Sequence, residues 1–134
     1  MTAGKKDWTL EVGATFDKIL KFFDKRRNAI DISGFRFVLN VGASADSFAI
    51  AVLTSDEGGG IEVNVDNPDD TFARILYPID ETPGDDFVHP FDLIRPGYYY
   101  YNLYCELPEP SHRRVRLMEG KFIVSPGVKG LTSA

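Results

Sequence analysis

The chain has 134 residues, of which 43% are hydrophobic and 26% charged, and its formal net charge at pH 7 is −5. This length predicts one domain with a core that needs no covalent crosslinks, and a single cysteine excludes an intrachain disulfide. The negative charge argues against nucleic-acid binding, which depends on clustered positive charge. No apolar run matches a signal peptide or a membrane-spanning helix, so we expect folding in a reducing cytosol and no membrane partner.

The composition changes at both ends of the chain. Residues 1–8 are mostly small and polar and predict a flexible arm. Residues 9–128 carry the apolar runs and predict a single domain, and residues 129–134 predict a tail.

Short apolar or alternating runs, separated by turn residues, predict strands through the first part of this domain. They cover residues 8–16, 17–23, 35–43, 47–54, 61–66 and 71–77. The second and the last of these runs also fit a short helix, but alternation in one and Pro78 after the other favour strands. In the last run we expect Phe72 and Ile75 to be buried. The almost continuous apolar run over 47–54 is typical of a strand covered on both faces.

Residues 94–124 predict a β-hairpin that begins with a Pro-Gly pair and a long aromatic strand. Gly120 falls within its second strand, which indicates a bulge or the close approach of another backbone. Side chains in a strand alternate between the two faces. The face expected in the core carries Tyr99, Tyr101, Leu103, Cys105 and Leu107, and the opposite face carries Tyr98, Tyr100, Asn102 and Tyr104.

Tyr98, Tyr100 and Tyr104 form what we call the tyrosine stripe, for which two interpretations stay open. Tyrosine is enriched at protein–protein interfaces, so the stripe is one candidate contact surface. Alternatively, the acidic segment over residues 79–93 of the same chain lies over these rings and covers them.

Basic residues gather around residues 18–27 and 112–116. They either keep the protein soluble and protect sheet edges, or dock on an acidic neighbour such as another copy of the chain. We include Arg113 and Arg114 with the tyrosine stripe as candidate interface residues.

Catalytic chemistry finds little support, because a nucleophile needs a base held beside it. Cys105 is predicted in the core, whereas His89 and His112 are predicted in surface loops, so we expect no enzyme and no cofactor. Asp85 and Asp86 are weak candidates for a calcium site, since their spacing follows no known calcium loop and Asp also favours turns. Residues 58–60 are all glycine and predict a hairpin turn.

Four motifs occur in an order that resembles the small β-sandwich structural proteins of tailed bacteriophages. They are IDISGF at residues 30–35, IRPGY at 94–98, YNL at 101–103 and MEGKFIV at 118–124. In the first motif, Ile30 and Ile32 are expected to point inward, Asp31 and Ser33 to hold a turn, and Gly34 to take an unusual backbone angle. The proteins resembled are the tail-collar, side-fibre-attachment proteins of siphophages and the amino-terminal domain of baseplate upper proteins.

Closely spaced strands with turn signals between them predict an all-β fold, an immunoglobulin-like antiparallel β-sandwich. The resemblance implies a non-enzymatic virion protein, assembled in the host cytoplasm as a tail-tip or baseplate collar or adaptor subunit in a ring that anchors fibres. Its partners would be copies of itself and other virion proteins. The alternatives are a capsid decoration or head-completion protein, and a carbohydrate- or calcium-dependent binding module.

Overall fold

Strands dominate the computed structural model of the chain, which describes residues 4–67, 69–77, 88–111 and 113–126. The strands are β1 (Gly4–Lys5), β2 (Trp8–Glu11), β3 (Phe16–Leu20), β4 (Arg36–Gly42), β5 (Ala49–Thr54), β6 (Ile61–Asn64), β7 (Phe72–Tyr77), β8 (Gly97–Glu106) and β9 (Arg114–Ser125). A short 3-10 helix, η1 (Pro90–Leu93), precedes β8. The expected all-β class is therefore confirmed, and so are strands in place of the two short helices considered from the sequence.

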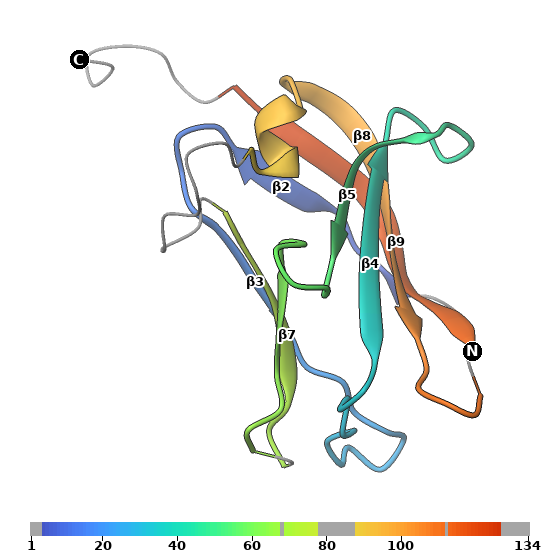
Figure 1. Cartoon of the computed structure of the whole chain (residues 1–134). Coiled ribbons are helices and arrows are strands. Elements are labelled where there is room, and N and C mark those ends of the chain that lie inside the picture. Colours follow the sequence, from blue (N-terminus) through green and yellow to red (C-terminus); the bar gives the residue numbers. More distant parts are fainter. Residues whose placement is uncertain (1–3, 68, 78–87, 112, 127–134) are drawn as a thin grey trace.

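The strands form two sheets (Figure 1). The larger follows the order β1-β9-β8-β4-β5, with β2 also paired to β9, and the smaller follows β3-β7-β6. β1 and β2 run parallel to β9, whereas the other strand pairs of the described residues are antiparallel. The expectation of a wholly antiparallel fold is wrong at this edge.

One cluster of buried side chains lies between the sheets and draws on both of them. Trp8 of β2 stacks on Tyr101 of β8 with ring centroids 4.1 Å apart, and meets Phe16 of the smaller sheet edge-on at 6.0 Å. In β7, Ile75 is buried as expected, but the residue beside it on the core face is Ala73. Phe72 is only half-buried, because residues on one face of a strand lie two positions apart.

The amino-terminal segment joins the sheet earlier than the sequence predicted. Gly4 and Lys5 pair with β9, and Trp8, which is only 1% exposed, belongs to the core. The expected arm over residues 1–8 therefore extends too far, because the sheet already begins at Gly4. The alternating pattern did not reveal this pairing, because β1 is two residues long and exposed.

β5 corrects a second expectation. It is the last strand of the larger sheet, and Ile50 and Val52 on its outer face are 46% and 44% exposed, whereas Ala51 and Leu53 are buried. η1 contacts this strand and lies on the side away from β4 (Figure 1), while Gly60 forms a bridge to Thr54. The strand is thus covered on one face and protected along its edge, but it is not covered on both faces.

The three glycines over residues 58–60 do not form a hairpin turn, because β5 and β6 belong to different sheets. They carry the chain from the larger sheet to the smaller one. Gly58 and Gly60 both have positive φ angles, of 75° and 100°, which glycine adopts without strain.

His89 was expected in a surface loop, but it is 3% exposed at the start of η1. Its Nδ1 accepts a hydrogen bond from the backbone N–H of Phe91 at 3.0 Å. Asp92 reciprocates, because its Oδ2 accepts from the backbone N–H of His89 at 3.1 Å. The histidine therefore caps η1, whose Phe91 ring packs against those of Phe16 and Phe122.

Candidate functional site

The tyrosine stripe lies on the outer face of the larger sheet, as the alternation along β8 predicts. Tyr98 is 79% exposed, Tyr100 is 42% exposed and Tyr104 is half-buried. The opposite face is in the core, where Tyr101, Leu103 and Cys105 are buried and Tyr99 and Leu107 pack at the margin. The assignment of β8 side chains to two faces is confirmed.

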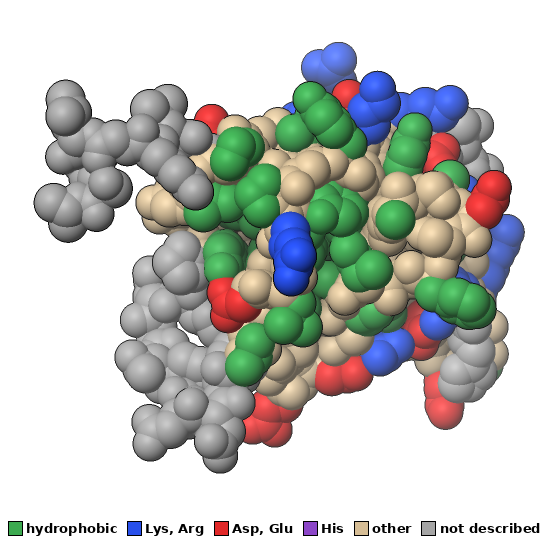
Figure 2. Space-filling model, turned by 90° about the horizontal axis from the view of Figure 1, so that it is seen from above, with side chains coloured by type: hydrophobic (Ala, Val, Ile, Leu, Met, Phe, Trp, Pro, Cys, Tyr) green, Lys and Arg blue, Asp and Glu red, His purple; other side chains and the backbone are tan. Residues whose placement is uncertain are grey.

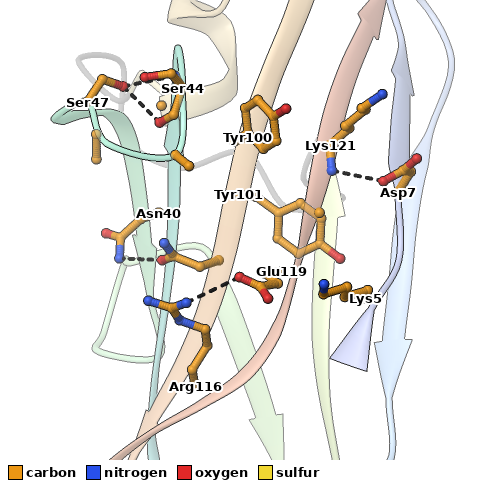
Figure 3. Close-up of a pocket in the computed structure, with 15 residues that line it drawn as sticks. Lys5, Asp7, Asn40, Ser44, Ser47, Tyr100, Tyr101, Arg116, Glu119 and Lys121 are labelled. Carbon is orange, nitrogen blue, oxygen red and sulfur yellow. Dashed lines mark hydrogen bonds and ion pairs between the residues drawn. The ribbon is translucent and has the colours of Figure 1, made fainter. Parts of the chain in front are cut away.

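A cavity of about 390 Å³ is hollowed into this outer face (Figure 3). β4, β8 and β9 supply its floor, the β4–β5 connection supplies one wall, and residues at β1 supply the other. The polar and aromatic side chains that line it include Lys5, Asp7, Asn40, Tyr100, Asn102, Arg116, Glu119 and Lys121. We call this the outer-face cavity.

The strand register explains why these side chains meet. Asn102 of β8 pairs with Asn40 of β4 on one side and with Glu119 of β9 on the other. One step along the same face, Tyr100 pairs with Gly42 and with Lys121. Because Gly42 has no side chain, the β4–β5 connection can lie close to this face: a Cβ atom at Gly42 would meet Ser47 Oγ at 3.0 Å and the Phe48 carbonyl oxygen at 3.2 Å.

An amide pair occupies the centre of the cavity floor. The Asn40 side-chain N–H donates to Oδ1 of Asn102 at 3.1 Å. This bond leaves the carbonyl oxygen of Asn40 as an acceptor and the NH₂ group of Asn102 as a donor, both available to a ligand. Across the cavity, Ser47 holds the β4–β5 connection by accepting from the Ser44 N–H and donating to the Ser44 carbonyl, each at 3.0 Å.

Arg116 lies at the border of the cavity, at the bottom of the view in Figure 3, and hydrogen bonds hold its guanidinium group in place. Its Nε and Nη2 donate to the Tyr104 hydroxyl at 3.1 and 2.8 Å, and its Nη1 lies 3.2 Å from Glu119 Oε2. The hydrogen bond to Tyr104, more than the carboxylate of Glu119, raises the pKa of Arg116. Tyr104 is therefore engaged within the molecule, and the freely presented rings of the stripe are Tyr98 and Tyr100.

Two lysines flank the cavity on the side of β9. The backbone N–H of Lys121 donates to Asp7 Oδ1 at 2.9 Å, which ties the amino-terminal segment to β9. Among the described residues, no ion pair involves the ammonium group of Lys5 or of Lys121. These two charges are therefore available to a bound anion.

The arginines proposed for the interface lie at the other end of β8. Arg114 Nη2 is 2.7 Å from Glu106 Oε1, and Arg36 approaches the same carboxylate at 3.2 Å. Glu106 is eight residues from Tyr98, roughly 26 Å along an extended strand. Arg113 and Arg114 therefore do not form one compact patch with the exposed tyrosines.

An apolar surface that the sequence did not predict covers one end of the molecule, which we call the apolar end. Figure 2 looks onto this end and shows hydrophobic side chains spread over it, with basic side chains mostly along its border. Its large exposed residues come from the loops and strand ends there: Val12, Phe48, Val88, Leu93 and Tyr98. Phe48 is 96% exposed. The sequence predicted Phe48 in a covered strand because residues 47–54 form an apolar run. Nothing in the sequence distinguishes this side chain from a core residue.

Catalytic and metal-binding groups are not brought together in the part of the chain that the structure describes. No group of three or more His, Cys, Asp or Glu side chains there is placed to hold a metal ion. Asp85, Asp86 and His112 lie outside the described residues. Cys105 is buried, and this burial raises the pKa of its thiol, which lowers the fraction of reactive thiolate.

Neither a protein-family model nor a curated protein sequence matches this chain. Within the described ranges, no helix is long and apolar enough to cross a membrane. Because no relative indicates a function, the function is inferred from two surfaces, the outer face of the larger sheet and the apolar end.

Proposed function

We propose that this protein is a non-enzymatic structural subunit of a tailed-bacteriophage virion. It would act at the tail tip or baseplate as a collar or adaptor subunit that assembles into a ring and anchors fibres. Its partners would be further copies of the chain and other virion proteins. The order of the four sequence motifs supports this class of protein.

The first motif has a clear structural role. Asp31 Oδ1 accepts from the backbone N–H of Ser33 at 3.0 Å and from its hydroxyl at 2.6 Å. Ile32 is buried between these two polar residues, and Gly34 follows with a φ of 82°. The residues shared with the phage pattern thus form a turn that anchors the chain in the core before β4.

A hydrogen bond between Tyr99 and the second motif supports an immunoglobulin-like sandwich as the finer description of the fold. Tyr99, near the start of β8, donates its hydroxyl to the backbone carbonyl of Arg95 at 2.6 Å. A tyrosine that bonds back to the chain a few residues upstream is a recurrent corner of immunoglobulin-like domains. The parallel pairing of β2 with β9 is an additional edge feature beside this pattern.

The apolar end is the observation that carries the assembly proposal. Phe48 and Tyr98 expose most of their surface to solvent, with Leu93 and Val88 exposed on η1 and just before it. Large exposed apolar patches on a soluble protein mark contact surfaces, and tyrosine is favoured in them. In a ring, each such contact is repeated at every subunit, so modest individual affinities add up. The same surface would also serve a capsid decoration or head-completion subunit.

Replacing Tyr98 and Tyr100 by serine tests this proposal. We expect the double variant to keep its fold but to associate at least about tenfold more weakly, because interface tyrosines commonly contribute 1–2 kcal/mol or more. Sedimentation velocity over a range of concentrations measures association, and circular dichroism checks the fold.

Ile19→Ser is the matched control, because Ile19 is an exposed apolar residue on the smaller sheet. It should leave association unchanged. The proposal would be abandoned if the wild-type protein is strictly monomeric and if mass spectrometry of purified virions finds no peptide from it. Peptides in tail fractions or in capsid fractions separate the two virion locations.

A further inference from the structure

The outer-face cavity differs in chemistry from the apolar end, because polar and charged groups dominate it. Its volume of about 390 Å³ falls within the range of small-ligand sites, which is roughly 300–1,000 Å³. From its side chains we infer that it binds an oligosaccharide that carries a carboxylate. This inference does not depend on the virion role proposed above.

The floor of the cavity suits the alternating polarity of a sugar. A sugar ring has hydroxyl groups at its rim and a C–H face that packs on aromatic rings. Asn40 and Asn102, held together by their mutual hydrogen bond, offer one acceptor and one donor side by side, which matches a hydroxyl that donates and a hydroxyl that accepts. The Tyr100 ring, which is 42% exposed and lines the cavity, provides the apolar surface (Figure 3).

The charge distribution favours an acidic ligand. The cavity is lined by three cationic side chains, Lys5, Arg116 and Lys121, and by two anionic ones, Asp7 and Glu119. Arg116 is paired with Glu119, whereas the ammonium groups of both lysines have no ion pair among the described residues. The lining side chains carry a net charge of +1, from three cations and two anions, on a chain whose net charge is −5, and this local positive charge attracts a carboxylate.

A peptide ligand fits this site less well. Peptides that bind sheets usually add a strand to a free edge. The floor strands offer no such edge, since β4 is paired with β5 and β8, and β8 is paired with β4 and β9. Recognition by side chains that line the face of a sheet, as in sugar binding, needs no free backbone groups.

The test is binding of the purified full chain to an immobilised panel of oligosaccharides. Half of the panel carries glucuronate, galacturonate or sialic acid, and half consists of neutral oligosaccharides of similar length. A tetraglutamate peptide is included as a purely electrostatic probe. We expect binding to at least one acidic saccharide, with the neutral saccharides and tetraglutamate binding at least about tenfold more weakly, a difference of roughly 1.4 kcal/mol.

Two variants locate the binding in the cavity. Asn102→Leu removes the donor from the amide pair and keeps the side chain's approximate size, and Lys121→Ala removes one unpaired charge. Each should weaken saccharide binding about tenfold, as expected for the loss of one or two hydrogen bonds to a ligand. Lys25→Ala is the charge-matched control, because Lys25 is exposed and does not line the cavity.

The outcomes separate this inference from the assembly proposal. Tyr98→Ser should weaken association and leave saccharide binding within about twofold, because Tyr98 does not line the cavity. Asn102→Leu should weaken saccharide binding and leave association unchanged. The inference is overturned if no acidic saccharide binds, if tetraglutamate binds equally well, or if folded Asn102→Leu and Lys121→Ala bind like the wild type.

Discussion

Gly120 shows how a single residue fixes the position of the amino-terminal segment. A Cβ atom at this position would lie 2.2 Å from the carbonyl oxygen of Lys6. That oxygen also accepts the Tyr101 hydroxyl at 2.5 Å, and the Lys6 N–H donates to the Glu119 carbonyl at 3.0 Å. The sequence indicated either a bulge or a close backbone approach at Gly120, and the structure shows the close approach.

We therefore expect Gly120→Ala to destabilise the fold by about 1–3 kcal/mol, because the obstructing atom belongs to the backbone and cannot turn away as a side chain would. The free energy of unfolding from urea titration measures the effect. Gly4→Ala is the control, since a Cβ there has its nearest neighbour at an ordinary 3.6 Å. Equal stability of the two variants would show that Lys6 does not pack against Gly120 in solution.

At the scale of elements, η1 is a short helix whose cap depends on a neutral histidine. His89 Nδ1 accepts the Phe91 N–H, so it must carry no proton. Burial lowers the pKa of His89, although the carboxylate of Asp92 opposes this shift. Tyr77 donates its hydroxyl to Asp92 Oδ1, and burial, more than this bond, raises the pKa of Tyr77 to about 12, so it remains a donor at neutral pH.

This arrangement predicts a loss of stability in mild acid. Because the pKa of His89 is lower in the folded protein than its ordinary value of 6.5, the unfolded chain takes up the proton first. The contribution of His89 is complete above pH 6.5 and declines as the pH falls below that value towards the folded pKa. Melting temperatures measured between pH 7.5 and pH 5 should therefore decrease.

His89→Asn provides the comparison, because an asparagine oxygen can accept the Phe91 N–H at any pH in this range. The variant should melt at a lower temperature than the wild type at pH 7.5 but show a flatter dependence on pH. If wild type and variant lose stability in parallel between pH 7.5 and pH 5, groups other than His89 control the acid sensitivity.

The elements also show what the sequence can predict and where it stops. Alternation predicted both faces of β8 correctly, because that strand is long and its two faces differ sharply in polarity. The same approach failed for β5, where Ile50 and Val52 are as apolar as their buried neighbours yet face solvent. The parallel pairing of β2 with β9 joins residues more than a hundred positions apart, and no local pattern encodes such a partner. The outer-face cavity likewise depends on the register of three strands.

For the molecule as a whole, the path of the chain ties the two sheets together. The chain passes from the larger sheet to the smaller between β2 and β3, returns before β4, crosses again between β5 and β6, and returns before β8. Neither sheet is therefore a continuous stretch of sequence. Each would lose its core face if the other unfolded, because both contribute to one buried cluster.

This connectivity predicts that the protein unfolds in a single cooperative step. Trp8 is the only tryptophan in the sequence and lies buried on the larger sheet, so its fluorescence reports on that sheet. A second probe, Ile19→Trp in a Trp8→Phe background, reports on the smaller sheet through an exposed position of β3. Within each protein, the urea transition followed by fluorescence should coincide with that followed by circular dichroism, as two-state unfolding requires. If Ile19→Trp fluorescence changes at a lower urea concentration than the circular dichroism of the same variant, the smaller sheet opens independently and the shared core does not couple the two.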